Sequence, residues 1–446
     1  MRKVVAILMI ILCFLLYEFA PTRYNYNYSV ICGCVYLFLI ILYYFLKQKK
    51  NYLDFDSIFF FTFFFVTLYY PIFMFETDAT RYFMFAFPFN ESFIPKGSAL
   101  AVLGIASYMA GGLFFDDKKN DKTNILSQKL DYKKIPNKHL YIISLVTFLL
   151  YIFTGGYSEM QAYYSGEKIK ESSGISAYFF LFCPAFLFSA LIIEFYNLKN
   201  LSPIKFDKKR ISIVSFITTM TIFFLILISG SRTVPLQIIL LLFGVYSLYY
   251  KDINLIKFAG SIFVGVILMF AVVVFRGYEQ EDTFSLGDVV MDLIINNRST
   301  YLAMEIVDQK GLMLGENMIS PAAAPIPFLQ SLFISSGFDV NDLSSSKFFT
   351  VYTLGEFDGF GLGTNIIADI FLSFDFVGVI ALMFLLGFMV AKSRFFAKSN
   401  IYYLAIYAIF MSYAVYLVRA EYFYFLRYMV WSLVIIFFTK NKFKFS

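Results

Sequence analysis

The sequence predicts an all-α polytopic membrane protein with about twelve transmembrane helices. Hydrophobic residues make up 59% of the 446 residues and charged residues only 15%, whereas a soluble domain has roughly 45–50% apolar and about 25% charged residues. Several apolar runs are long enough to cross a hydrocarbon core of about 30 Å as helices. These runs, such as residues 4–20, are continuously apolar, while the strands of a membrane barrel would alternate polar and apolar residues. A soluble fold is therefore excluded.

Twelve apolar segments are expected to form the spans. They lie near residues 4–20, 29–46, 55–75, 97–115, 139–154, 175–195, 211–229, 234–250, 257–275, 366–390, 400–418 and 422–439. Nine spans with short loops thus occupy residues 1–275, and three occupy residues 366–446. Residues 276–365 between them form the only large hydrophilic segment, and we call it the long loop. A connection of this length without secondary structure is uncommon, so we expect short helices in it that cover one end of the bundle.

The distribution of lysine and arginine predicts the orientation. If the spans alternate in direction, 25 of the 37 basic residues fall in the loops and termini on one side. Cytoplasmic loops carry the excess of basic residues. Both termini and the lysine-rich residues 116–138 are therefore expected in the cytoplasm, and the long loop outside. Synthetic chemistry on the outer face would need a substrate that is already activated, because no nucleotide sugar is present there.

Arginines on the outer side are candidates for binding an anion. The guanidinium group offers a planar pair of donors that suits a phosphate. Arg232 lies in a very short external hairpin, Arg276 opens the long loop, and Arg419 opens the last hairpin. Arg427 is expected on the same helical face as Arg419, about 10 Å below the outer boundary.

Structural explanations compete with anion binding for two of these residues. Arg276 could anchor the end of a helix at the membrane surface. Arg427 could pair with Glu421 or Asp369 within the protein. Anion binding is the stronger interpretation for Arg232, Arg419 and Arg427, because all three depart from the positive-inside trend in short or embedded settings.

Carboxylates on the outer side are candidates for a general base. Asp369 is the most informative, because an acid within a span needs a partner. Most of the others are expected to be solvated. The candidates in or near the long loop are Glu279, Glu281, Asp282, Asp288, Asp292, Asp339, Asp342, Glu356, Asp358 and Glu421.

Several other motifs are given structural interpretations. Asp54 and Asp56 form an Asp-x-Asp pattern at the start of a span, where a position at the membrane surface is favoured over nucleotide binding. Gly359, Gly361 and Gly363 predict a hinge or a tight loop before the tenth span. His139 is the only histidine and falls on the inner side. The cysteines have no metal-binding spacing, so we predict no metal and no cofactor.

Three stretches resemble Wzy-type polymerases of O-antigen and oligosaccharide repeat units. They are residues 228–232 (ISGSR), residues 360–369 (FGLGTNIIAD) followed by 374–378 (FDFVG), and residues 419–427 (RAEYFYFLR). The layout is also similar, with about twelve spans, abundant Phe and Tyr, and one dominant external loop late in the chain. The resemblance implies a multi-pass protein of the bacterial inner membrane with a fold akin to the GT-C glycosyltransferases.

The resemblance also implies a reaction. The enzyme would transfer a growing glycan from undecaprenyl pyrophosphate to another lipid-linked repeat unit, without a metal and with a possible chain-length regulator as partner. Cations would stabilise the departing diphosphate and a base would activate the acceptor. The expected pyrophosphate ligands are Arg232, Arg276, Arg419 and Arg427. The candidate catalytic carboxylates are Asp369, Glu421 and Asp282, and the long loop would contribute Arg298, Glu279 and Glu356 to the substrate.

Two other functions on the same lipid-linked substrate remain open. An O-antigen ligase would often use an external histidine, and none is expected here. A flippase for lipid-linked oligosaccharides would have two similar halves and short external loops, whereas this chain has one external loop of about 90 residues. Nucleic acid is not expected as a partner, because the basic residues are gathered in one class of loop.

Overall fold

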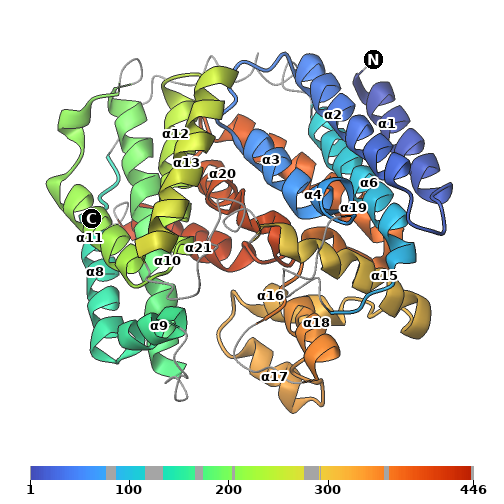
Figure 1. Cartoon of the computed structure of the whole chain (residues 1–446). Helices are drawn as coiled ribbons and strands as arrows, with labels where there is room; N and C mark the ends of the chain where they lie inside the picture. Colours follow the sequence, from blue (N-terminus) through green and yellow to red (C-terminus); the bar gives the residue numbers. More distant parts are fainter. Residues whose placement is uncertain are drawn as a thin grey trace.

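The computed structural model describes residues 2–76, 87–115, 134–165, 174–202, 206–275, 291, 293–355 and 361–442. Within these ranges the regular elements are all helical, with no β-strand, which confirms the all-α prediction. The long helices run between two ends of a bundle, and the short helices of the long loop lie together at one of them (Figure 1).

A helix overlaps each of the twelve segments that were expected to span the membrane. These helices are α1 (Arg2–Glu18), α2 (Tyr26–Lys47), α3 (Phe55–Thr67), α6 (Ile94–Phe114), α8 (Lys138–Phe153), α10 (Gly174–Leu201), α11 (Ile213–Ile228), α12 (Thr233–Tyr249), α13 (Leu255–Phe275), α19 (Ile366–Phe396), α20 (Ile401–Tyr413) and α21 (Leu426–Lys442). Short helices α4 (Tyr69–Phe73) and α9 (Gly156–Ser165) follow α3 and α8. The long loop contributes α15 (Arg298–Lys310), α16 (Ile319–Ala323), α17 (Leu329–Ser335) and α18 (Ser345–Leu354).

Helix length separates clear membrane spans from shorter helices. In the described part of the chain, α2, α10, α19 and the combined helix Glu91–Phe114 are long and apolar enough to cross a bilayer. A fifth span results if α8 and α9, bent by 66°, are taken together. Several other apolar helices, including α3, α12 and α20, have only 10–17 residues. The protein is thus a multi-pass membrane protein, but its helices do not confirm twelve crossings or a GT-C-like arrangement.

One end of the bundle collects the loops that are rich in lysine. We call it the basic end; it contains residues 47–54, 134–138, 250–254 and 396–400. The Tyr52 amide donates to the Ile253 carbonyl at 2.8 Å, and the Tyr249 hydroxyl donates to the Ala397 carbonyl at 2.8 Å. Segments far apart in the chain therefore meet here, as the alternation of the spans predicts.

The opposite end, which we call the loop end, contains residues 229–232, 293–355, 361–365 and 414–425. Helices α15 to α18 lie along the lower edge of the molecule in Figure 1. Both chain ends point away from this region: Lys3 lies over the Phe114 ring at 5.6 Å, and Lys440 lies over the Tyr402 ring at 5.0 Å. The first and last helices therefore both have their terminal ends at the basic end.

Glycines allow α6 and α19 to cross at backbone contact. A Cβ atom added to Gly111 would lie 1.9 Å from the carbonyl oxygen of Phe384, and one added to Gly387 would lie 1.9 Å from that of Tyr108. No side chain fits at either position. Small residues permit such close approach between membrane helices, where packing and not hydrophobicity holds helices together.

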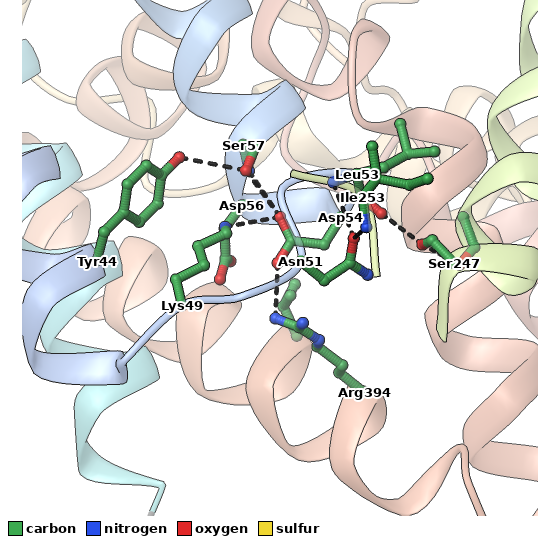
Figure 2. A network of polar contacts seen from close by, with 12 residues as sticks. Tyr44, Lys49, Asn51, Leu53, Asp54, Asp56, Ser57, Ser247, Ile253 and Arg394 are labelled. Atoms are coloured by element: carbon green, nitrogen blue, oxygen red, sulfur yellow. Dashed lines mark hydrogen bonds and ion pairs between the residues drawn. The ribbon is translucent and has the colours of Figure 1, made fainter. Parts of the chain in front are cut away.

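A buried ion network holds α2, α3 and α19 at the basic end (Figure 2). Asp54 is fully buried and accepts from Lys49 at 2.7 Å and from Arg394 at 2.6 Å. Burial alone would raise the pKa of Asp54, but the charges of Lys49 and Arg394 lower it to about 2. Asp54 therefore lies inside the bundle and not on its surface, because two cations from distant segments compensate its charge.

Asp56 is also buried, and it connects a fourth helix, α6, to this network. Its two carboxylate oxygens accept hydrogen bonds from the Tyr108 hydroxyl at 2.6 Å and the Tyr43 hydroxyl at 3.1 Å. Groups of the protein itself thus hold both carboxylates of the Asp-x-Asp pair, which fits a structural role at the basic end.

Candidate functional site

The polar centre of the loop end is built on a break in α19. Phe374 and Asp375 have non-helical backbone angles, with φ −139° and ψ 16° at Phe374 and φ 56° and ψ −163° at Asp375. The break leaves residues 366–373 as a short half-helix that is buried along its whole length. Asp369 projects from this half-helix and is 0% exposed. A broken helix is a common way to place polar groups within the depth of a membrane protein.

The long loop supplies the hydrogen bonds that the break leaves unmade. The Met313 amide donates to the Leu372 carbonyl at 3.0 Å. The side-chain amide of Asn317 donates to the carbonyl of Asp369 at 3.0 Å and to its Oδ1 at 2.8 Å. The Ser373 hydroxyl in turn donates to Asn317 Oδ1 at 2.7 Å. The loop is therefore part of the structure that holds Asp369, and not only a cover above it.

Asp369 and Glu421, two of the predicted catalytic residues, are brought together. The backbone amide of Tyr422 donates to Asp369 Oδ2 at 2.8 Å, which holds the neighbouring Glu421 beside the half-helix. The charge of Glu421 acts on Asp369, and Glu421 is 9% exposed. The arrangement joins two carboxyl groups that are far apart in the sequence.

Serines at the start of α18 surround this carboxyl pair. The Ser344 hydroxyl donates to Glu421 Oε1, and Ser345 contacts Asp369. Burial raises the pKa of Glu421 above its ordinary value, and hydrogen bonds from Ser344 and the Ser346 amide, with the charge of Lys347, oppose this. A carboxylate with a raised pKa can accept a proton at a pH closer to neutrality than an exposed one.

A tight connection before α19 links the pair to the rest of the loop end. Asn365 caps the half-helix, accepting from the Ala368 amide at 2.9 Å, and its side chain donates to the Asn296 carbonyl at 2.7 Å. Gly363 has φ 72°, and a Cβ atom there would lie 2.7 Å from Asn296 Oδ1. The prediction of a tight loop is thus confirmed at Gly363, while Gly359 lies outside the described residues.

The structure corrects the expected position of Arg427. Helix α20 ends at Tyr413, a short 3-10 helix contains Tyr416–Arg419, and α21 starts only at Leu426. Arg427 is therefore in the first turn of α21 and does not share a continuous helical face with Arg419. Residues 422–425 are aromatic and were expected at the start of the last span. They instead form a turn, and the Tyr422 amide donates a hydrogen bond to Asp369.

Arg427 contacts the long loop and, among the described residues, does not pair with an acid. Its Nε donates to the Ala324 carbonyl at 3.2 Å, and the ion pairs of the described residues involve only Asp54 and Asp207 as acids. Helix α21 has 17 residues and is about 25 Å long, which is shorter than a hydrocarbon core of about 30 Å. Because α21 ends at the basic end, Arg427 lies at the opposite end of this short helix.

Arg232 and Arg419 both lie at the loop end. Arg232 precedes the first turn of α12, and the Arg419 carbonyl accepts from the Asn296 side chain at 3.3 Å. Tyr413 connects α12 to Arg427, because Gln237 of α12 forms a hydrogen bond with its hydroxyl and the charge of Arg427 acts on it. The three arginines thus occupy neighbouring elements, and their convergence on one ligand stays a prediction.

Arg298 forms its contacts with other residues of the protein. It is buried, its Nη2 donates to the Pro88 carbonyl at 2.9 Å, and its guanidinium lies 6.0 Å from the centre of the Phe89 ring. Burial lowers its pKa to about 10, so it remains a cation at neutral pH. The other predicted loop and site residues, Arg276, Glu279, Asp282 and Glu356, lie outside the described residues.

Sequence reasoning missed the neutral residues that organise the site. Asn317 and Ser344 contact the two carboxyl groups directly, but a single Asn or Ser in a long loop carries no signal of its own. The nearest signal is the carboxyl groups of Asp369 and Glu421 themselves, since buried carboxylates require hydrogen-bond donors from somewhere in the chain.

Comparison with known proteins gives one match. A family model described as O-antigen polysaccharide polymerase Wzy matches residues 1–441. No curated protein and no solved structure matches the chain. The matched range includes the half-helix, the long loop and the turn between α20 and α21.

Proposed function

Because the chain belongs to the Wzy family of O-antigen polysaccharide polymerases, we propose that it extends glycans carried on undecaprenyl pyrophosphate. The growing glycan is the donor and a second lipid-linked repeat unit is the acceptor. The bond between the donor sugar and the pyrophosphate breaks, and a glycosidic bond forms to a hydroxyl of the acceptor's terminal sugar. The acceptor proton passes to a base, and the lipid pyrophosphate leaves. The observation that carries this proposal is the buried Asp369–Glu421 pair, at the same end of the bundle as Arg427, which forms no ion pair with an acid among the described residues.

Glu421 is the proposed base. It retains 9% exposure, whereas Asp369 has none and both of its carboxylate oxygens accept hydrogen bonds. Asp369 is then a positioning residue, since it binds the amide that follows Glu421. Asp282 remains a further candidate base on the sequence argument.

Arg427 is the proposed centre of the pyrophosphate site. An arginine below the membrane boundary is costly unless it faces protein, water or an anion, and no carboxylate among the described residues balances this one. The pyrophosphate of a lipid carrier must lie near that boundary while its tail stays in hydrocarbon. Arg232, Arg419 and, from the sequence, Arg276 would complete the site and stabilise the charge of the leaving group.

The long loop would hold the acceptor. Glu279 and Glu356 are proposed to contact its sugars, and Arg298 to fix the loop on the bundle through the carbonyls of Phe87 and Pro88. Excluding water near the pair would limit hydrolysis of the activated donor.

The proposed orientation places the basic end in the cytoplasm and the loop end in the periplasm, with the protein in the inner membrane. The excess of lysine at the basic end supports it. Reporter fusions at both termini and within the long loop test this orientation. A terminus accessible from the periplasm would contradict it.

Deletion of the gene, followed by gel analysis of the surface glycan, tests the activity. We expect loss of the polymer ladder with a single repeat unit retained on the lipid core, and recovery with the wild-type gene. Loss of every repeat unit would instead indicate a ligase or a flippase. Deletion of a partner that regulates chain length should change the distribution of polymer lengths without loss of the ladder.

A further inference from the structure

We propose that residues 326–338 of the long loop are seated in the lipid bilayer and contact the acyl chains of the leaflet at the loop end. We call these residues the apolar segment; they include α17. The proposal concerns contact with membrane lipid and is independent of the reaction proposed above.

The composition of this part of the loop is unlike that of a loop in water. Residues 317–338 include no Asp, Glu, Lys or Arg. Ile326, Phe328 and Leu332 are 59%, 74% and 61% exposed. Large exposed apolar patches on a protein mark interaction sites, and an uncharged apolar surface on a membrane protein matches the hydrocarbon of the bilayer.

The base of the apolar segment is attached to α21, which packs against α10. The carbonyls of Ala324 and Pro325, just beyond α16, accept from Arg427 Nε at 3.2 Å and from the Trp431 indole at 2.7 Å. The Trp431 ring stacks on Phe182 of α10 with the ring centres 4.9 Å apart. Carbonyls at a helix end need protein donors where water is scarce, so these bonds fit a position at membrane depth.

The apolar segment continues a surface that already faces lipid. The Phe328 ring lies 6.1 Å from that of Tyr178, which is near the start of α10, one of the clear membrane spans. Ile175 in the same turn region is 65% exposed. This neighbouring surface belongs to a span. Lipid that covers the start of α10 would therefore also cover the apolar segment beside it.

The backbone at Phe328 supports a role for its side chain. Phe328 has φ 66°, a left-handed conformation that is unfavourable for a residue with a Cβ atom. Glycine would make this turn without strain. A large aromatic side chain kept in this position, and directed outward, fits an anchor in the membrane surface.

Site-directed fluorescence in the full-length protein tests the proposal. Cys34, the exposed cysteine, is replaced by Ser, and an environment-sensitive dye is attached to Phe328→Cys in phosphatidylcholine vesicles. We expect a blue-shifted spectrum, with several-fold stronger quenching by a lipid carrying a shallow nitroxide than by aqueous iodide. The same label at Gln309→Cys, an exposed site on α15, should show the reverse preference.

A second labelled position controls for a disturbance of the turn at Phe328. Leu332→Cys should behave as Phe328→Cys does, even if the turn at Phe328 is disturbed. Labels at both positions that respond to iodide as strongly as the Gln309 label would overturn the proposal. Because the measurement needs no substrate, it is independent of the proposed polymerase mechanism.

Discussion

The backbone amide of Tyr422 donates a hydrogen bond of 2.8 Å to the carboxylate of Asp369. This one contact fixes the turn after α20 against the half-helix of α19. It also determines where Glu421 lies, because Glu421 precedes the donating amide. A buried carboxylate that accepts main-chain and side-chain hydrogen bonds is held rigidly, so Asp369 can position Glu421 without contacting the substrate.

The hydrogen bond from Ser344 to Glu421 predicts a change in pH dependence. Glu421 must be deprotonated to act as a base, so activity falls as the pH drops through its raised pKa. Ser344→Ala removes a donor to the charged form, worth about 1.5–3 kcal/mol, and should move the acidic limb of the rate profile upward by about one to two pH units. Polymerisation of purified lipid-linked repeat units at several pH values measures this shift.

Two variants make this prediction specific. Glu421→Gln should lose polymerisation over the whole pH range while keeping its elution profile. Ser336→Ala, in an exposed part of the loop, should leave the profile unchanged. An acidic limb that stays in place in Ser344→Ala, or moves to lower pH, would count against Glu421 as the base.

The rate of polymerisation should depend on the planar pair of donors of Arg427. Arg427→Gln removes the charge and is expected to lower the rate by about 100-fold or more, as the loss of a donor to a charged transition state does. Arg427→Lys keeps the charge without the planar geometry, and should retain more activity than Arg427→Gln but less than the wild type. Initial rates and the gel ladder measure the activities of both variants. Equal activity in Arg427→Gln and the wild type would show that Arg427 is not part of the site.

The ion network at the basic end should contribute stability and no chemistry. Asp54→Asn leaves Lys49 and Arg394 without their shared acid, and should reduce the free energy of unfolding by about 3–5 kcal/mol. The matched control is Asp207→Asn, which breaks an exposed pair with Arg210 and should cost about 1 kcal/mol or less. Unfolding by SDS in mixed micelles compares the two; similar losses would contradict the prediction.

The crossing of α6 and α19 should not tolerate a side chain. Gly387→Leu forces the backbones apart and should destabilise the protein by about 3 kcal/mol or more. At Gly260 of α13 an added Cβ has no neighbour within 4 Å, so Gly260→Leu should change stability by about 0.5 kcal/mol or less. The same unfolding assay ranks the two, and an equal response would mean that the crossing is loose.

The positions of the helices could be predicted because each apolar run is a local property of the chain. Asp369 could also be identified, since a carboxylate among apolar residues demands a partner. The break at Phe374 could not, because the hydrogen bonds that compensate it come from Met313 and Asn317 in the long loop. Asp54 was placed at the surface for a similar reason, as its partner Arg394 is 340 positions further along the chain.

Hydropathy alone also failed at the last hairpin. Residues 422–425 are aromatic and would suit a helix in the membrane, yet they form a turn before α21. Arg427 therefore lies in the first turn of α21, and not in the middle of a span.

The loop residues Asn317 and Ser344 are bonded directly to Asp369 and Glu421. Lifting the loop away would therefore dismantle the carboxyl pair, and this part of the loop cannot serve as a lid that opens at every turnover. The substrate must reach the site by another path. For the proposed substrate, which has a long hydrocarbon tail, we expect that path to be lateral diffusion within the leaflet, so that the lipid approaches sideways between helices while the glycan strand, still attached to its lipid, extends into the aqueous space.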